Sequence, residues 1–302
     1  MIPHLLPLPG NEPLAAALCK QLRAELGSLN ARHFPDGESY LRIDSDVAGR
    51  TVILVATLDR PDDKTLRVLF AADAARDLGA ARVGLIAPYV AYMRQDRRFK
   101  PGEAITSVSY ARLLSQAFDF LVTIDPHLHR HASMDEIYTI PVGVGHATAA
   151  IAAWIKQSVP QPLIIGPDAE SQQWVAAVAE RAAAPFTVLD KTRRGDRDVV
   201  VALGPMEQFK GLHPVLVDDI ISSGRTMEVT VRLLLQQGFP APIVVGVHGL
   251  FSGDAFARLQ DAGAGRIVSC NSVPHASNAI DLTELISSEL TQLLAKHIPS
   301  KR

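Results

Sequence analysis

The residues best suited to chemistry lie together in segment 215–226, which reads Val-Leu-Val-Asp-Asp-Ile-Ile-Ser-Ser-Gly-Arg-Thr. An apolar run that predicts a buried strand ends in two adjacent carboxylates, Asp218 and Asp219. Small residues then lead into a predicted helix, and such a turn lets backbone N–H groups and the helix dipole converge on an anion. The residues of this turn are Ser222, Ser223, Gly224, Arg225 and Thr226. Because carboxylates repel a bare phosphate but bind vicinal hydroxyls, directly or through Mg²⁺, the segment predicts a sugar-phosphate site. The alternative is a plain strand–turn–helix corner in which Asp218 is only a turn residue.

An aromatic residue and two acids lie in an early loop with the sequence Phe34-Pro-Asp-Gly-Glu38. The face of Phe34 can stack on a purine, while Asp36 and Glu38 can accept hydrogen bonds from its exocyclic amine. The alternative is a Pro-Asp-Gly turn between strands with Phe34 in the core.

A dense group of cations follows the expected strand 82–87. Residues 94–100 read Arg-Gln-Asp-Arg-Arg-Phe-Lys, with Asp96 among four basic residues. Such runs are usually solvated surfaces. The position just after a strand of a strand–helix unit favours binding of a triphosphate.

Two strand-end residues, His127 and Asp168, are a candidate pair of Mg²⁺ ligands, one from each half of the chain. Few protein ligands are needed, because Mg²⁺ keeps several waters and takes phosphate oxygens. The alternative for His127 is a core or turn histidine. The neighbouring His129 and His131 do not make a zinc site, since no Cys or Glu completes the set.

The segment Lys191-Thr-Arg-Arg194 is surrounded by acids, and it predicts an exposed, mobile loop. Its cations could stabilise the charge that develops in a phosphoryl-type transfer if the loop closes over the site.

Segment 215–226 is similar to the phosphoribosyl diphosphate (PRPP) loop of phosphoribosyltransferases and PRPP synthases. The rest of the chain separates these two groups. In order and approximate spacing, the further motifs resemble those of the ribose-phosphate pyrophosphokinase family, and the resemblance runs from residue 34 to residue 226. These motifs are 34–38, 94–97, Asp125-Pro-His127, Gly166-Pro-Asp168 and 191–194.

The resemblance implies an enzyme that transfers the diphosphoryl group of ATP to the 1-hydroxyl of ribose 5-phosphate, with Mg²⁺ as cofactor. It assigns ATP to Phe34, Asp36, Glu38, Arg94, Gln95, Asp96 and His127, and ribose 5-phosphate to Asp218, Asp219 and residues 222–226. It gives the catalytic role to Lys191 and Arg193, and it singles out His127 among the histidines. It also implies a homo-oligomer in which the loop 34–38 holds the adenine of a neighbouring subunit.

Two departures leave alternatives open. Ser222, Ser223 and Gly224 with Arg225 are closer to a transferase loop, and Glu170 would repel a diphosphate unless it points away. A PRPP-consuming phosphoribosyltransferase explains segment 215–226 but not the other motifs. A catalytically inactive regulatory relative would be expected to lack ligands, and here all the matched acids and cations are present.

The elements that must position these residues alternate between strands and helices. Nearly all-apolar runs predict buried parallel strands at 51–55, 82–87, 120–124, 162–165, 199–202, 214–217 and 243–246. Helical spacing predicts helices at 64–78, 107–117, 171–182 and 226–237. This pattern is typical of an α/β fold, with ligands at the carboxyl ends of the strands. With the family resemblance, we expect two similar phosphoribosyltransferase-like domains, 1–145 and 146–302, each a mainly parallel sheet flanked by helices.

Composition narrows the functional class. The 302 residues include 47% hydrophobic and 21% charged residues, which excludes general disorder. A net charge of −2 argues against nucleic-acid or anionic-membrane binding. Two cysteines are too few for a disulfide framework, and no apolar run is long enough to span a bilayer. We therefore expect a cytoplasmic protein.

Overall fold

The computed structural model describes residues 2–128, 130–168, 171–194, 198–202 and 206–297, without the side chains of residues 190–202 and 297. The chain forms two compact units. Unit 1 comprises the residues up to His146 together with the C-terminal helix, and unit 2 runs from Ala147 to Leu282.

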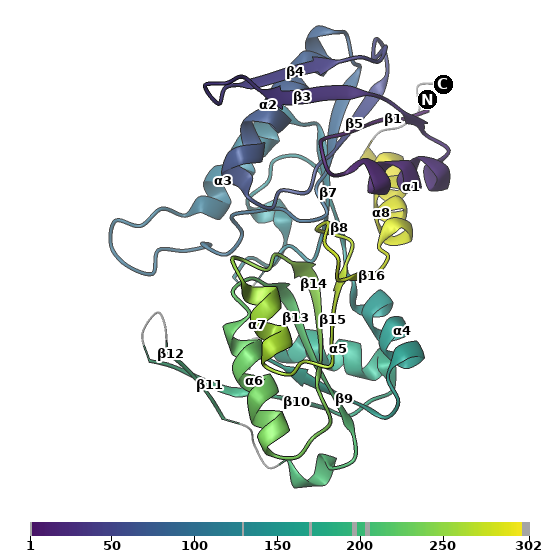
Figure 1. Cartoon of the computed structure of the whole chain (residues 1–302). Coiled ribbons are helices and arrows are strands. Elements are labelled where there is room, and N and C mark those ends of the chain that lie inside the picture. Colours follow the sequence, from purple (N-terminus) through teal and green to yellow (C-terminus); the bar gives the residue numbers. More distant parts are fainter. Residues whose placement is uncertain (1, 129, 169–170, 195–197, 203–205, 298–302) are drawn as a thin grey trace. The chain divides into compact units, whose positions relative to one another are not determined.

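Unit 1 is built on a parallel sheet with the strand order β2-β1-β5-β6-β7-β8 (Figure 1). Helices α1 and α8 pack together on one face, and α2 and α3 pack together on the other. A separate antiparallel hairpin, β3–β4, follows the edge strand. The elements are β1 (His4–Pro7), α1 (Glu12–Leu22), β2 (Glu25–Leu26), β3 (Leu29–His33), β4 (Ser39–Ile43), β5 (Thr51–Val55), α2 (Pro61–Asp77), β6 (Arg82–Ile86), α3 (Thr106–Ala117), β7 (Phe120–Ile124), β8 (Val142–Gly145) and α8 (Thr283–His297).

Unit 2 repeats this plan with a parallel sheet in the order β10-β9-β13-β14-β15-β16. Helix α4 packs on α5, and α6 packs on α7. The antiparallel hairpin of this unit is β11–β12. The elements are α4 (Thr148–Ser158), β9 (Pro162–Gly166), α5 (Gln172–Ala182), β10 (Phe186–Val188), β11 (Asp190–Arg194), β12 (Asp198–Ala202), β13 (His213–Ile221), α6 (Arg225–Gln236), β14 (Ile243–Gly249), α7 (Ala255–Asp261), β15 (Arg266–Cys270) and β16 (Asn278–Ile280).

The expected fold class, two similar α/β halves with mainly parallel sheets, is confirmed by this shared strand order. All-apolar strands such as β5 and β7 are buried along their whole length, because helices cover both faces of the sheet. The central strands of both units therefore lie in the core, and their carboxyl ends are the edges at which loops can carry function.

The predicted strand 199–202 is present, but its expected place in a parallel sheet was wrong. The apolar run 199–202 belongs to β12, which pairs antiparallel with β11 in a two-stranded hairpin and not with the central sheet. The partner strand of this hairpin, β11, contains the segment 191–194, which was expected to be a loop.

The C-terminal helix differs from the expected domain range 146–302. Helix α8 packs on β7 and β8 of unit 1. Glycines on β8 allow this close approach: a Cβ at Gly145 would lie 2.9 Å from the side chain of Leu285, and one at Gly143 would lie 3.3 Å from Leu293. Among the helices in the described part of the chain, none is long and apolar enough to cross a membrane.

Candidate active site

Three aspartates, Asp168, Asp218 and Asp219, are placed at the carboxyl edge of the unit 2 sheet. Strands β9 and β13 are parallel neighbours with Val215 opposite Ile164, so the residues that follow them meet at one edge. Burial raises the pKa of Asp218 well above its usual range, and the charges of Asp219 and Asp168 raise it further. The charges of Asp219 and Asp168 therefore act on Asp218, whereas the predicted role of Asp218 and Asp219 in binding a sugar phosphate stays a prediction.

The local backbone orients the acid pair. The N–H of Asp219 donates to Oδ1 of Asp218 at 3.0 Å, and the N–H of Ile220 donates to Oδ1 of Asp219 at 2.8 Å. Asp168 is held in a turn, because the N–H of Ser171 donates to its Oδ1 at 3.2 Å and the Ser171 hydroxyl donates to its carbonyl at 2.7 Å. These hydrogen bonds fix the orientation of the carboxylates at the ends of β9 and β13.

The predicted turn into a helix is present between β13 and α6. Gly224 takes φ +67°, which a glycine adopts without strain, and α6 begins at the next residue. Within the described residues, the N–H groups of Gly224, Arg225 and Thr226 donate to no protein acceptor. The positive end of the helix dipole and three free donors therefore lie next to the acid pair, which is the arrangement that binds an anionic group.

The unit 1 segment around Arg94 separates into exposed and buried parts. Arg94 is exposed and Gln95 is half-buried, whereas the side chain of Asp96 is only 3% exposed. Both Oδ atoms of Asp96 accept from Nη1 of Arg130 at 3.2 Å. Asp96 thus holds a second cation near the motif, and sequence reasoning did not single out Arg130 because the two residues are 34 positions apart.

The corner after β7 carries unusual backbone conformations. Asp125 and His127 have φ values of +36° and +49°, which residues other than glycine rarely adopt. The Asp125 carboxylate bonds Nδ1 of His146 at 2.9 Å, and this hydrogen bond raises the pKa of His146. Strain of this kind concentrates at functional sites, so it supports a functional role for His127.

The loop 34–38 is the tip of the β3–β4 hairpin, as the alternative turn interpretation also required. The N–H of Phe34 donates to the carbonyl of Glu38 at 2.8 Å, and the Glu38 N–H donates to Oδ1 of Asp36 at 3.1 Å. Phe34 is 40% exposed, so it is not a core residue. The guanidinium of Arg32 lies 4.9 Å from its ring centroid and 4.2 Å from that of Tyr40.

Several predicted residues cannot be placed in the same way. His129 and Glu170 lie outside the described residues, as do the side chains of Lys191, Arg193 and Arg194 on β11. His131 is described, and its Nδ1 lies 3.2 Å from Oε2 of Glu136. His127 belongs to unit 1 and Asp168 to unit 2, so their joint role as Mg²⁺ ligands stays a prediction. In the described part of the chain, no three His, Cys, Asp or Glu side chains gather as a metal site.

Comparisons with known proteins place both halves of the chain. A family profile described as the N-terminal domain of ribose phosphate pyrophosphokinase matches residues 4–117, and one described as a phosphoribosyl transferase domain matches residues 133–284.

Curated relatives match over nearly their whole length. A ribose-phosphate pyrophosphokinase of Saccharolobus solfataricus is 34% identical over 92% of this chain and 94% of its own. That of Methanobrevibacter smithii is 30% identical over 93% of this chain and 97% of its own. The crystal structure of phosphoribosylpyrophosphate synthetase from Mycobacterium smegmatis has the same fold, with a TM-score of 0.84 and 24% identity over 98% of this chain and 99% of that one.

Proposed function

The chain belongs to the ribose-phosphate pyrophosphokinase family, and we propose that it transfers the diphosphoryl group of ATP to the 1-hydroxyl of ribose 5-phosphate. The products are AMP and PRPP. The observation that carries this proposal is the full-length similarity to relatives of that name, together with an acid pair and a free helix N-terminus at one sheet edge.

Ribose 5-phosphate is bound at the carboxyl end of β13. The free N–H groups at the start of α6 receive the 5-phosphate, with the hydroxyls of Ser222, Ser223 and Thr226 beside them. Asp218 and Asp219 accept hydrogen bonds from the ribose hydroxyls, which explains why two acids stand beside an anion site.

ATP is bound by loops of unit 1. Phe34 stacks on the adenine, and Asp36 and Glu38 accept from its amine. Arg94 and Gln95 bind the phosphates, and Asp96 contributes through Arg130, which it holds by two hydrogen bonds.

The chemical step needs no protein nucleophile. The 1-oxygen of the sugar attacks the β-phosphorus of ATP, a new O–P bond forms, and the bond to the α-phosphate oxygen breaks to release AMP. Lys191 and Arg193 stabilise the charge that develops in this transfer.

Magnesium fits this site because carboxylates are hard oxygen ligands. The pKa of Asp218 is raised first by burial and then by the negative charges of Asp219 and Asp168, which a bound cation would offset. Asp168 and His127 would hold the ion, which when bound neutralises charge on the phosphate oxygens.

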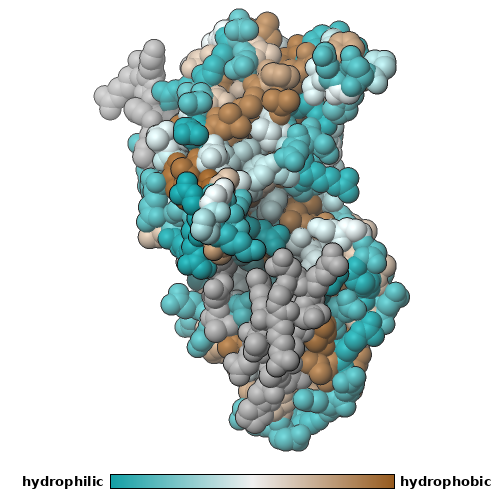
Figure 2. All heavy atoms as spheres, turned by 90° about the vertical axis from the view of Figure 1, so that its left-hand side faces the viewer, coloured by the Kyte–Doolittle hydropathy of each residue, from teal (hydrophilic) through white to brown (hydrophobic). Residues whose placement is uncertain are grey.

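The protein is further proposed to be a cytoplasmic homo-oligomer. Figure 2 shows apolar side chains gathered on part of the surface of unit 1. Large exposed apolar residues on its helices support such an interface: Leu66 and Phe70 on α2, and Val108 and Leu113 on α3. Exposed apolar patches of this kind commonly mark contacts with another protein chain.

The products formed from ATP, ribose 5-phosphate and Mg²⁺, followed by ³¹P NMR and nucleotide chromatography, test the reaction. We expect equal amounts of AMP and PRPP, and none when ribose 5-phosphate is omitted. Formation of ADP would mean transfer of one phosphoryl group and would exclude this reaction, and consumption of added PRPP with a free base would favour a phosphoribosyltransferase.

A further inference from the structure

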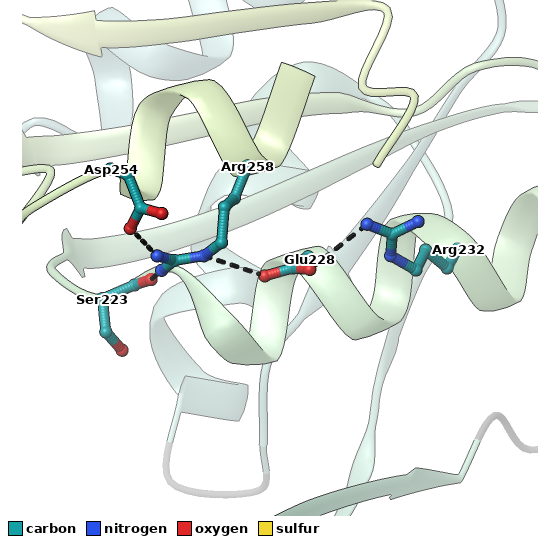
Figure 3. A network of polar contacts seen from close by, with 5 residues as sticks. All are labelled: Ser223, Glu228, Arg232, Asp254 and Arg258. Carbon is teal, nitrogen blue, oxygen red and sulfur yellow. Dashed lines mark hydrogen bonds and ion pairs between the residues drawn. The ribbon is translucent and has the colours of Figure 1, made fainter. Parts of the chain in front are cut away.

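Arg258, which no sequence motif singled out, is bonded to the turn that precedes α6. It lies on α7, and its Nη2 donates to the carbonyl oxygen of Ser223 at 2.7 Å (Figure 3). Its Nε donates to Oε2 of Glu228 at 3.2 Å, and its Nη1 donates to Oδ1 of Asp254. All three nitrogens of the guanidinium therefore have a protein acceptor, and each acceptor comes from a different segment.

The bond to Ser223 fixes the direction of one donor in the turn. The peptide unit between Ser223 and Gly224 is planar and trans, so its C=O and N–H point in opposite directions. With the carbonyl turned toward Arg258, the Gly224 N–H is turned away from α7. Among the residues that the structure describes, that N–H has no protein acceptor, and the same holds for the N–H groups of Arg225 and Thr226.

The first turn of α6 is held by the same guanidinium. Glu228 belongs to this turn, and its N–H donates to the carbonyl of Gly224 at 2.8 Å. Its carboxylate bridges Arg258 and Arg232, which donates to Oε1 at 3.3 Å. Arg258 thus bonds the turn before α6, through the Ser223 carbonyl, and the first turn of α6, through the Glu228 carboxylate. Arg232 bonds only the Glu228 carboxylate.

The charge of Arg258 is already compensated. Asp254 and Glu228 both pair with it, and its side chain is 31% exposed. A guanidinium held by two carboxylates and a carbonyl is oriented by the protein and has little freedom to swing onto a ligand.

We propose that Arg258 is a positioning residue for ribose 5-phosphate: by holding the Ser223 carbonyl, it keeps the free N–H groups at the start of α6 aimed at the 5-phosphate. This role rests on the proposed binding of ribose 5-phosphate at residues 222–226. It acts through the peptide groups and requires no contact between Arg258 and the substrate.

The test compares Arg258→Ala, Arg258→Lys and the control Arg232→Ala. The control removes the other arginine bonded to Glu228 and leaves the bond between Arg258 and the Ser223 carbonyl in place. The full chain is used, with KM for each substrate, kcat, Tm and calorimetric binding of ribose 5-phosphate. We expect Arg258→Ala to weaken the binding of ribose 5-phosphate by about tenfold or more, equivalent to about 1.4 kcal/mol. The KM for ATP is expected to stay within about twofold of the wild-type value. We expect Arg258→Lys to recover little, because an ammonium cannot present the fork that reaches three separated acceptors. Arg232→Ala is expected to match the wild type.

The outcomes are separable. Full recovery by Arg258→Lys would show that charge alone is needed and would overturn the positioning role. Equal losses for both substrates in Arg258→Ala, or the same loss in Arg232→Ala, would show a general packing role and overturn it as well. If the wild type binds ribose 5-phosphate and Arg258→Ala binds it equally well, only the positioning role is excluded. If the wild type does not bind ribose 5-phosphate, the proposed function and the positioning role are both overturned.

Discussion

Asp218 and Asp219 are adjacent acids at a half-buried sheet edge, and the charge of Asp219 disfavours ionisation of Asp218. Burial and the neighbouring charges raise the pKa of Asp218, so the free protein is destabilised where these groups are ionised. A sequence selected only for stability would place an amide or an apolar residue there. The acids are therefore best explained by a ligand that offers hydroxyls or a cation.

The residue Asp218 gives a stability prediction with a defined pH dependence. Its pKa is raised in the folded state, so the destabilisation is absent below the unfolded value of about 3.9 and develops as pH rises through the folded value. Asp218→Asn removes the charge and keeps an oxygen for the Asp219 N–H. We expect it to raise Tm at pH 7 in EDTA and to change Tm less at pH 4, and each 1 kcal/mol gained corresponds to roughly 2–4 °C. A larger gain at pH 4 than at pH 7 would contradict this assignment.

The same two acids give a substrate prediction. Asp218→Ala or Asp219→Ala should raise the KM for ribose 5-phosphate about tenfold or more and change the KM for ATP little, because a charge-assisted hydrogen bond contributes about 1.5–3 kcal/mol. Steady-state kinetics with each substrate varied in turn provides the measurement. Equal increases in both KM values would remove the acids from the sugar site.

Sequence reasoning identified functional segments whose residues are contiguous, but not residues whose role depends on partners far away in the sequence. The acid pair, the turn 222–224 and the hairpin tip 34–38 could be predicted, because each is a contiguous segment with its own local chemistry. Arg130 and Arg258 could not, since their partners Asp96 and Ser223 lie 34 and 35 positions away. An arginine in a charged segment has no local sign that it holds a functional loop.

At the scale of elements, short apolar runs predicted strands but not their partners. Runs 51–55 and 199–202 look alike in sequence, yet the first is a central parallel strand and the second forms half of a hairpin. Pairing depends on which strand the connecting segment returns to, and composition does not record this. The expected domain range 146–302 included the C-terminal helix α8, which the structure groups with unit 1. Its packing on β8 depends on glycines about 140 positions earlier, which local sequence does not reveal.

The N-termini of α2 and α6, which have equivalent places in the two units, differ in their suitability for an anion. Strands β5 and β13 have the same place in their sheets, and each leads into a helix, α2 or α6. The residue before each helix has positive φ, +50° at Arg60 and +67° at Gly224. The first turn of α2, however, contains Pro61, which has no N–H, and then Asp62 and Asp63. These acids satisfy the helix dipole and repel phosphate, so the unit 2 helix is the one suited to the sugar phosphate.

The hairpin β11–β12 gives a catalytic prediction. Lys191, Arg193 and Arg194 all belong to strand β11, and the family resemblance gives the catalytic role to the first two. Lys191→Ala and Arg193→Ala should each lower kcat by orders of magnitude with little change in ATP binding, because they act on the transition-state charge. Arg194→Ala serves as the control and should retain activity. Weakened ATP binding with normal kcat would mean that the two cations only hold the ground state.

At the scale of the whole molecule, one plan is used twice for different chemistry. In each unit, the chain forms a hairpin after the edge strand (β2 or β10) and before the third strand of the sheet (β5 or β13). The unit 1 hairpin carries the aromatic and acidic tip 34–38, whereas the unit 2 hairpin carries Lys191 and Arg193. The two units therefore carry a hairpin at the same point in the chain order, and the different sequences of these hairpins separate the proposed recognition of adenine from the proposed stabilisation of charge.

The exposure of Phe34 supports an active site that needs two subunits. Phe34 is 40% exposed, its ring contacts are with Arg32 and Tyr40 of its own hairpin, and two acids follow it, so it suits a purine brought by a neighbouring chain. Symmetric association would let each chain lend its hairpin to the other. We predict that inactive Phe34→Ala/Glu38→Ala chains, mixed and exchanged with inactive Asp218→Ala chains, recover activity, because some interfaces then combine an intact hairpin with an intact sugar site. Light scattering and exchange of differently tagged chains verify that mixed oligomers form. If mixed oligomers are present and the activity stays at the level of the separate variants, each hairpin serves its own chain and the shared site is excluded.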